Sequence, residues 1–359
     1  MKVSYFETAR YHAPGHMPSG WPAPPDIYDR DAGMRAYRGM IERVQYVEAL
    51  GFDWVSLSEH HYSPHRLTPT PIVSAAHIAG NSQRITIAVL GPIISQSNPV
   101  QVAENLAMLD NLAPGRLVVG MLRGTTGEYL SYGLNPAEAR ERTSEGMELV
   151  LKAWTEPQPF GWQGRHYQFR TVSVWPRPVQ QPHPPTYALG ASRESCEFAA
   201  RHHLGLGVSY APFEVVARVT GYYRERCAYY GWEPAPDHIV YRANILIADS
   251  DDAAQRRLAV QRRGRNPYPL QAPVRDALVA LDIRNVAGEA RTPNVGGTLP
   301  TNFVGGPDTV AEQLARCRRE TGVGVVDLLF QTPGAEDVGP LLASLELFGK
   351  EVLPRIREM

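Results

Sequence analysis

The sequence contains few cysteines for its length. Cys196, Cys227 and Cys317 are the three cysteines among 359 residues, and they are far apart. An odd, scattered set of this kind excludes a disulfide framework and provides no cysteine-based metal motif. Residues 1–7 also lack the apolar core of a signal peptide. We therefore expect a reducing compartment and a cytoplasmic location.

Two further absences concern membranes and polyanions. The chain has no apolar run long enough to cross a bilayer, because a spanning helix takes about 20 such residues. Its 36 Lys and Arg residues nearly balance its 37 Asp and Glu residues, and no long basic block disturbs that balance. The composition therefore argues against a membrane protein and gives no indication of nucleic-acid binding.

The sequence also lacks a Gly-x-Gly-x-x-Gly motif after its first expected strand, which weakens the prediction of a dinucleotide-binding fold. It does have a regular alternation of apolar strand-like segments with segments of helical periodicity. The eight expected strands are residues 3–7, 53–58, 85–90, 117–122, 186–189, 207–210, 240–248 and 325–330. Such alternation implies parallel strands joined by helices. Eight units favour a closed (β/α)8 TIM barrel that forms one domain over residues 1–359.

Three stretches interrupt the alternation and predict insertions. A long loop rich in Pro, Gly and aromatic residues follows the first strand, over residues 10–33. Residues 157–185, before the fifth strand, contain short alternating segments between prolines and predict a hairpin. Residues 264–306, between the seventh and eighth strands, contain many Pro and Gly residues and little periodicity. We interpret this last insertion as a lid, with a helical part near residues 274–281 as an alternative.

The second strand ends in Glu59-His60-His61, so three ionisable side chains lie at the edge where barrel enzymes hold their active sites. In an extended segment Glu59 and His61 point one way and His60 the other, so the three cannot ligate one metal ion. The other strand ends offer Arg, Ser and Gly, and we predict no metal site. A neutral imidazole can donate or accept a proton. The alternative, a histidine that only seats the loop by hydrogen bonding, applies more to His61 than to His60.

Two further strand ends carry groups suited to a phosphate. Arg123 follows the fourth strand, and Arg140 lies early in the next helix, after a glycine-rich loop. A guanidinium donates two parallel hydrogen bonds to an anion. After the fifth strand, residues 190–192 lead into a helix whose first turn holds Ser192 and Ser195. A helix amino terminus attracts anions, but ordinary capping by Ser192 explains the same pattern, and Arg140 could be a solvated residue among glutamates.

Four segments occur in a specific order along the first part of the chain. They are Gly51-Phe52-Asp53 leading into Glu59-His60-His61, Asn98-Pro99-Val100 through Leu109-Asp110, Gly115-Arg116-Leu117 through Arg123-Gly124, and Gly190 through Glu197-Phe198-Ala199-Ala200. The set resembles the bacterial luciferase family of flavin-dependent monooxygenases, over Met1 to about Leu206. Members of that family are single barrels that bind FMN at the carboxyl ends of the strands.

The resemblance implies roles for residues at several strand ends. The residues that it places around the flavin phosphate are Arg123, Arg140, Ser192 and Ser195. The residues that it places beside the ring are Glu59, Leu122, Gly190, Ala191 and the pair Leu90 and Gly91, whose peptide bond matches a cis peptide of the luciferases. The residue that matches the proposed catalytic base is His60.

The implied reaction is that of a two-component FMN-dependent monooxygenase. A separate NAD(P)H:flavin reductase would supply reduced FMN (FMNH2), and O2 would add to its carbon 4a to give a peroxide or hydroperoxide. The substrate would be a small organic molecule: an aldehyde, a heteroaromatic compound or a biosynthetic intermediate. The protein would contribute orientation, proton transfer and exclusion of water. The residues that could line a substrate pocket, or instead pack the first loop against the barrel, are Phe6, Tyr11, His12, Trp21 and Tyr28.

Two other functions stay open at this point. One is a deazaflavin-dependent hydride-transfer oxidoreductase on the same barrel. Between the two cofactors, the Glu-His pair and the two arginines favour FMN over a deazaflavin. The other is a non-catalytic flavin-binding protein. The resemblance also implies a homodimer that pairs through the helices after the second and third strands. Residues 98–111 offer Val102, Leu106 and Leu109 for such an interface, or for covering the barrel.

Overall fold

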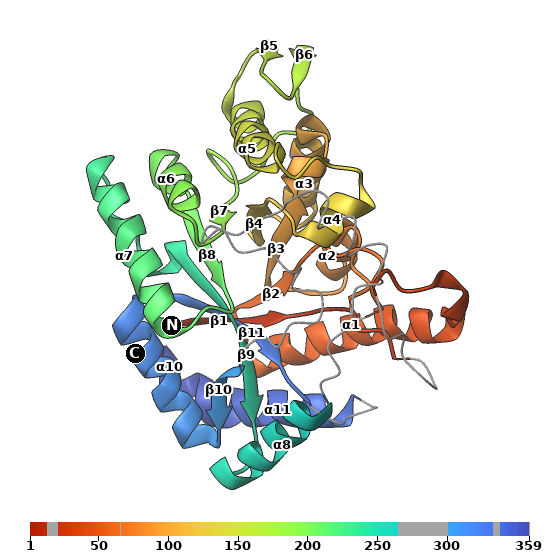
Figure 1. The fold of residues 1–359 in the computed structure, drawn as a ribbon, viewed down its shortest axis with the longest axis vertical. Coiled ribbons are helices and arrows are strands. Elements are labelled where there is room, and N and C mark those ends of the chain that lie inside the picture. The colour runs from red at the N-terminus through yellow and green to blue at the C-terminus, as the bar shows by residue number, and fades with distance from the viewer. Residues whose placement is uncertain (13–20, 65, 265–300, 333–337, 359) are drawn as a thin grey trace.

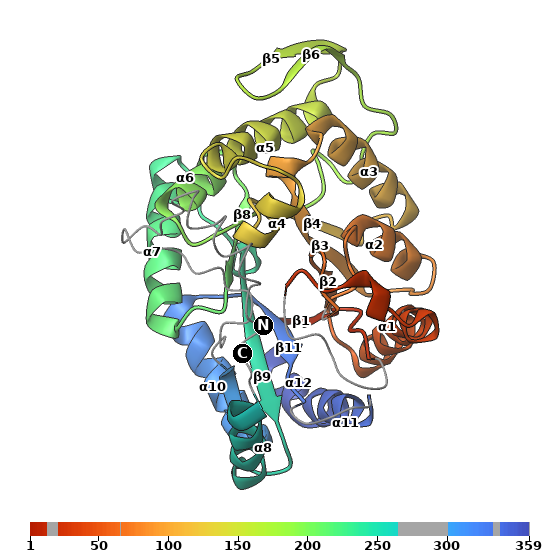
Figure 2. The same ribbon diagram turned by 45° about the vertical axis from the view of Figure 1, so that its right-hand side comes forward.

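The computed structural model describes residues 1–12, 21–64, 66–264, 301–332 and 338–358 of the chain. Its centre is a circle of strands with helices arranged around it, as Figures 1 and 2 show. The main sheet has nine strands in the order β10-β9-β11-β1-β2-β3-β4-β7-β8, and β8 also pairs with β9. Eight strands therefore close a barrel, and β10 lies outside the circle. The pairs within this sheet are parallel, which confirms the predicted (β/α)8 barrel.

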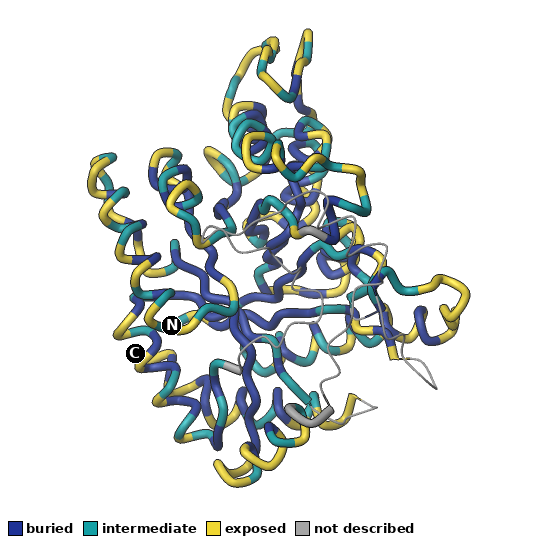
Figure 3. The backbone as a smooth tube through the Cα atoms, viewed as in Figure 1, coloured by how far each residue is buried: buried dark blue, intermediate teal, exposed yellow. Residues whose placement is uncertain are grey.

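The barrel strands lie close to the predicted ranges, because each is an apolar segment that is buried on both faces. They are β1 (Lys2–Phe6), β2 (Trp54–Leu57), β3 (Thr86–Ile93), β4 (Leu117–Leu122), β7 (Thr186–Leu189), β8 (Gly205–Ser209), β9 (Ile239–Ile247) and β11 (Val325–Phe330). Figure 3 shows them as the most deeply buried part of the chain, whereas the helices expose their outer faces.

Helices cover the outside of the barrel. They are α1 (Arg30–Leu50), α2 (Pro71–Ala79), α3 (Pro99–Leu112), α5 (Ala139–Thr155), α6 (Arg193–Arg201), α7 (Phe213–Tyr229), α8 (Asp251–Gly264), α10 (Pro307–Thr321), α11 (Gly339–Leu347) and α12 (Leu353–Arg357), with the short α4 (Thr126–Ser131) before α5. Their ends follow sequence signals. For example, Asp29 caps α1 by accepting the N–H of Ala32 at 2.6 Å, and Gly51 ends it in a left-handed conformation with φ of 91°.

The barrel interior is built in layers along the strands. Trp54, Val240 and Val325 belong to a buried apolar cluster inside the barrel. Two residues further along the same strands, Ser56, Arg242 and Asp327 form a buried polar group. Ser56 Oγ donates to Asp327 Oδ1 at 2.6 Å, and Arg242 Nε donates to Asp327 Oδ2 at 2.6 Å. Because side chains of a strand alternate between its faces, this layering puts apolar packing at the amino ends and polar groups nearer the carboxyl ends.

All three predicted insertions lie partly or wholly among the described residues. The first ends earlier than predicted, because residues 30–33 belong to α1. Within residues 157–185, β5 (Phe160–Gln163) and β6 (Gln168–Val172) form an antiparallel pair that stands away from the barrel beyond α5 (Figure 1). Within residues 264–306, the predicted lid and the helix near 274–281 lie outside the described residues. The end of this insertion is not irregular as predicted, because residues Thr301–Gly305 form strand β10.

Strand β10 extends the sheet where β9 leaves the barrel. β9 pairs with β8 up to Arg242 and with β10 from Asn244 onward. On the other side of β10, the side-chain amide of Gln313 accepts the N–H of Val304 and donates to its carbonyl oxygen, both at 2.9 Å. The side chain of a helix residue thus occupies the hydrogen-bonding positions that a further strand would use.

Helix α3 carries the three residues that were predicted either to form a dimer interface or to cover the barrel, and in the structure they cover the barrel. Val102, Leu106 and Leu109 on α3 are buried in the main core. The exposed apolar side chains of α3 are instead Met108 and Leu112. The prediction of an interface through Val102, Leu106 and Leu109 is therefore wrong, because packing within the monomer already covers these side chains.

Candidate active site

Glu59 is fixed between the carboxyl ends of β2 and β3. Its carboxylate accepts hydrogen bonds from the backbone N–H of Ile93 at 3.1 Å and from Gln96 Nε2 at 2.9 Å. It also contacts His61 Nε2 at 3.0 Å, and the His61 side chain is only 4% exposed. His61 therefore takes the seating role that the sequence allowed for it, and the carboxylate of Glu59 is held in one orientation.

His60 points away from this pair, as the alternation predicts. Its Nδ1 lies 3.3 Å from Glu128 Oε1, and its Nε2 is in close contact with Arg66 Nη1. Since arginine can only donate, Nε2 accepts, and we assign the ring proton to Nδ1, where it is donated to Glu128. Burial and the neighbouring Arg66 lower the pKa of His60 to about 4. His60 is thus a neutral imidazole near pH 7.

Glu128 anchors that imidazole from α4. Together with Thr125 it forms a capping box in which Oε2 accepts the N–H of Thr125 at 2.9 Å. Burial opposes ionisation of this carboxyl, but hydrogen bonds from His60 and Thr125 hold its pKa at about 2. The sequence analysis missed Glu128, although the Thr-x-x-Glu spacing signals a cap. It also missed Arg66, whose loop position carries no comparable signal.

The predicted phosphate groups meet at the amino terminus of α6. Ser192 is its N-cap, accepting the N–H of Ser195 at 3.2 Å, and the two hydroxyl oxygens lie 3.1 Å apart. The capping alternative is therefore present in the structure. Arg140, from the first turn of α5, reaches the same place and pairs with Glu194 at 2.7 Å; both side chains are largely exposed. Gly190 leaves room for this arrangement, because a Cβ there would lie 2.5 Å from Ser195 Oγ.

The ends of β3 and β4 carry the remaining predicted residues. Leu90 is buried inside the barrel, Leu122 and Arg123 are half-buried, and Ala191 beyond β7 is exposed. The carbonyl oxygen of Arg123 accepts a hydrogen bond from Ser95 Oγ at 2.7 Å. Its guanidinium forms no hydrogen bond or ion pair with the residues that the structure describes.

The expected cis peptide between Leu90 and Gly91 is absent. Within the described ranges, the cis bonds precede Pro22, Pro176 and Pro182, so the Leu90–Gly91 bond is trans. The register between β3 and β4 shifts after Leu90 instead. Glycine at position 91 is nevertheless needed, because a Cβ would lie 2.7 Å from Ser58 Cα and 2.8 Å from the backbone nitrogen of Glu59. Close packing of β3 against the end of β2, rather than a cis bond, explains this glycine.

Two buried polar atoms near Glu59 have unused hydrogen-bonding capacity. Ser58 Oγ and Gln96 Oε1 have no partner among the described residues. Such atoms are costly to bury unless a ligand or water satisfies them. Over the same residues, no cluster of three or more His, Cys, Asp and Glu side chains could hold a metal ion. Nor does that part of the chain contain a helix long and apolar enough to cross a membrane.

The closed parallel sheet and the ionisable groups at the carboxyl ends of its strands define the class of protein. It is a (β/α)8 barrel with a candidate site at that end. The chain belongs to the luciferase-like monooxygenase family, whose model matches residues 4–324. The flavin-dependent trigonelline monooxygenase, oxygenase component, of Acinetobacter baylyi is 25% identical over 64% of this chain and 64% of its own. The chain spans between about half and two thirds of the length of several curated relatives.

Solved structures with low sequence identity share the whole fold. Monooxygenase RslO1 from Streptomyces bottropensis has a TM-score of 0.75 at 23% identity, covering 99% of this chain and 100% of its own. An F420-dependent secondary alcohol dehydrogenase, in complex with an F420–acetone adduct, has a TM-score of 0.70 at 15% identity, covering 99% of each chain. At these identities the likeness establishes the barrel and leaves the cofactor open.

Proposed function

We propose that this protein is the oxygenase of a two-component monooxygenase that uses reduced FMN and O2 to oxygenate a small organic substrate. A separate NAD(P)H:flavin reductase would supply the reduced flavin, in keeping with the name of the trigonelline relative, an oxygenase component. When bound, reduced FMN supplies the electrons for the reaction of O2 with the substrate. The observation that carries the proposal is the group at the amino terminus of α6, where Ser192, Ser195 and Arg140 gather.

These residues fit the phosphate of FMN. The N–H groups of the first turn of α6 and the two hydroxyls would donate to its oxygens in place of their present partners, and Arg140 would balance its charge. Arg140 now pairs with Glu194, but an exposed ion pair of this kind is worth only about 0–1 kcal/mol. The Glu194 carboxylate also accepts hydrogen bonds from its own N–H and from Ser192, and a phosphate that displaces it would take over these donors as well as Arg140. Arg123, at the end of β4, would be the second cation.

The polar end of the ring fits the groups around Glu59. Ser58 Oγ and Gln96 Oε1 have hydrogen-bonding capacity that a flavin would use, and Glu59 is already held by three donors. His60 would exchange a proton with the substrate through Nε2 once Arg66 releases that atom. Glu128 would stabilise the imidazolium that forms.

Binding measurements with FMN and riboflavin test the phosphate site. Arg140→Gln should weaken FMN binding roughly five- to tenfold, because one charge-assisted contact at an exposed position is lost, and should leave riboflavin binding unchanged. Arg165→Gln is the matched control, since Arg165 is an exposed residue paired with Glu141. The measurement is quenching of flavin fluorescence. Equal FMN affinities of the two variants would sink the assignment.

The shared barrel of the F420-dependent dehydrogenase makes hydride transfer the second candidate function. Titration of the protein with FMN and with a deazaflavin separates the two, since tighter binding of the deazaflavin would favour hydride transfer. A slower reappearance of oxidised flavin absorbance when protein-bound reduced FMN meets O2 would favour the monooxygenase. Flavin binding with unaltered oxidation would favour a non-catalytic flavin-binding protein.

We also propose that the protein forms a homodimer through α2 and α3. The side chains available for that contact are the exposed Val73, Met108 and Leu112. The mass of the protein in solution, measured by light scattering, decides this point.

A further inference from the structure

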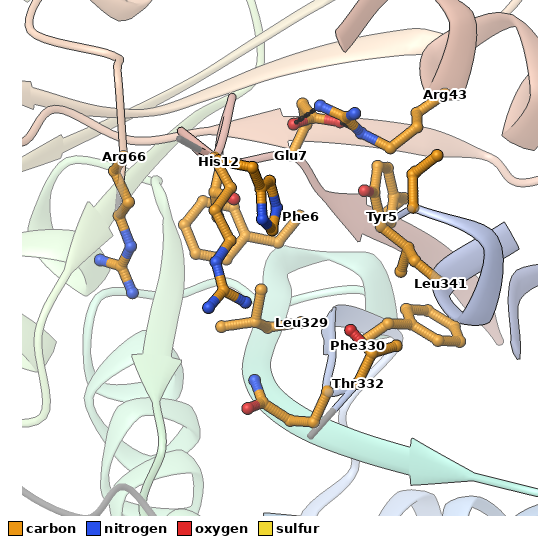
Figure 4. Close-up of a pocket in the computed structure, with 14 residues that line it drawn as sticks. Tyr5, Phe6, Glu7, His12, Arg43, Arg66, Leu329, Phe330, Thr332 and Leu341 are labelled. Atoms are coloured by element: carbon orange, nitrogen blue, oxygen red, sulfur yellow. Dashed lines mark hydrogen bonds and ion pairs between the residues drawn. The ribbon is translucent and has the colours of Figure 1, made fainter. Parts of the chain in front are cut away.

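A pocket lies at the carboxyl ends of β1 and β11, next to the site described above. It has a volume of about 250 Å³ and is lined by Tyr5, Phe6, Arg66, Phe330 and Leu341 among others. Figure 4 shows Arg66 and His12 toward one end and Tyr5, Phe330 and Leu341 toward the other. The volume is near the lower limit of ligand pockets, roughly 300 Å³, which suits a compact molecule rather than a long chain.

Positive charge exceeds negative charge in this pocket. Its carboxylate, Glu7, is already neutralised by Arg43, which donates two hydrogen bonds to it at 2.7 and 2.8 Å. The other basic side chains of the lining are Arg10, His12 and Arg66. Arg10 forms no ion pair with the residues that the structure describes, and neither does Arg66. Two guanidinium groups are therefore available to an anion.

Arg66 is the half-buried member of the two. Its guanidinium lies 5.3 Å from the centre of the Phe6 ring and contacts Nε2 of His60, a neutral acceptor. Arg242 lies 3.8 Å from the same ring, but Asp327 balances its charge. Burial lowers the pKa of Arg66, and Arg242 adds to this effect, whereas Tyr210 and Glu128 partly oppose it. An anionic ligand would offset the cost of burying this unpaired cation.

The rest of the lining gives the ligand an apolar side. Tyr5, Phe330 and Leu341 lie together at the end of the pocket away from Arg66 (Figure 4). A ligand with a carboxylate at one end and a compact apolar body at the other would satisfy both halves. Its carboxylate would accept the two parallel hydrogen bonds of the Arg66 guanidinium.

We propose that this pocket binds an organic acid, whose carboxylate contacts Arg66 and Arg10 and whose apolar part packs on Tyr5, Phe330 and Leu341. The contact between Arg66 and His60 makes this acid the substrate of the proposed monooxygenase, and that second statement rests on the proposed function. Binding of the acid would draw Arg66 away from Nε2 of His60. The acid would then free the histidine atom that exchanges a proton.

Calorimetric titration with paired probes tests the pocket. The probes are benzoate and hexanoate, each compared with its amide, on the protein with and without FMN. We expect each acid to bind at least about tenfold more tightly than its amide, because a charge-assisted contact is involved. Arg66→Gln should abolish this preference, whereas Arg319→Gln, an exposed arginine of α10, should preserve it. The failure of both acids to bind better than their amides would overturn the proposal.

Three further outcomes are decisive. If Arg66→Gln fails to fold, Arg10→Gln, at an exposed position, should reduce the acid preference severalfold, and an unchanged preference overturns the proposal. If Arg66→Gln weakens FMN but not riboflavin, the pocket binds the flavin phosphate and the proposal is wrong. A protein that binds no flavin but prefers acids to amides would refute the proposed function and leave the acid pocket supported.

Discussion

At the scale of single residues, two adjacent histidines have opposite environments. His61 is buried against Glu59 and serves to hold that carboxylate. His60 lies between an anion, Glu128, and a cation, Arg66, which polarise its ring in a fixed direction. The two side chains leave the end of β2 on opposite sides, which is what the alternation of an extended segment predicts. Two adjacent histidines therefore provide one imidazole that holds Glu59 and one that lies between opposite charges.

Replacement of His60 should change how stability depends on pH. Its pKa is lowered from 6.5 to about 4 on folding, so below pH 6.5 the unfolded chain binds a proton that the native protein does not. The wild type should therefore lose stability as pH falls from 6.5 to about 4, by roughly 3 kcal/mol if the full shift applies. His60→Asn should lack this loss. Urea unfolding at several pH values measures it, with exposed His77→Asn as the control.

The dependence of stability on pH is best compared between wild type and His60→Asn above pH 4.5, because Glu128 affects stability only below that pH. Its lowered pKa of about 2 provides stability that is present above its ordinary value of 4.5 and is lost as pH falls toward 2. If the free energies of unfolding of wild type and His60→Asn differ by a constant amount from pH 6.5 down to 4.5, the assigned environment of His60 is contradicted.

The candidate site was only partly predictable from residue types. Glu59 and His60 follow a buried strand, and Ser192 follows another, so their positions at the barrel edge come from local pattern. Arg66 comes from the loop after β2 and Glu128 from α4, which follows β4, and their meeting at His60 depends on tertiary packing. The spacing of residues in the sequence carries no record of such long-range contacts.

At the scale of elements, strand ends and helix starts are held together by close backbone contacts. β3 passes so near the end of β2 that only glycine fits at position 91. Eight strands were predicted because their apolar runs are bounded by clear turns. β10 was missed because Thr301–Gly305 contains only two large apolar residues, Phe303 and Val304, and follows a stretch rich in Pro and Gly. A short strand at the edge of a sheet has a weak pattern.

Gly91→Ala should destabilise the protein by about 1–3 kcal/mol, because the new methyl group would overlap backbone atoms of Ser58 and Glu59. It should also weaken flavin binding by displacing Glu59. Gly221→Ala on α7 is a matched control, since no atom lies within 4 Å of the added Cβ. Alanine there should stabilise the helix by up to about 1 kcal/mol. Urea unfolding of both variants checks this, and equal stabilities would contradict the close contact.

At the scale of the whole molecule, one buried cluster of three polar side chains connects separate strands of the barrel. Ser56, Arg242 and Asp327 come from β2, β9 and β11 and meet inside it. Closure of the barrel itself follows from the count of strand–helix units, so it could be predicted. The group inside could not, because serine, arginine and aspartate in apolar strands give no indication of which partner each one faces.

Asp327→Asn should cost about 3–5 kcal/mol, because Arg242 would remain as a buried charge without its partner. Asp308→Asn is the control: Asp308 is 91% exposed and pairs with Arg355 at the surface, so its loss should cost at most about 1 kcal/mol. The double variant Arg242→Leu with Asp327→Leu should recover much of the stability. Equal thermal stabilities of Asp327→Asn and Asp308→Asn would refute this role of the pair of Arg242 and Asp327.

The hydrogen bonds of Gln313 to Val304 have a consequence for association between molecules. An unprotected outer strand such as β10 would present free N–H and C=O groups to the strands of other chains, which is a route to aggregation. At Val304 both groups are already occupied by the glutamine amide. At this residue a single side chain of α10 therefore takes the place that a strand of a neighbouring molecule would occupy.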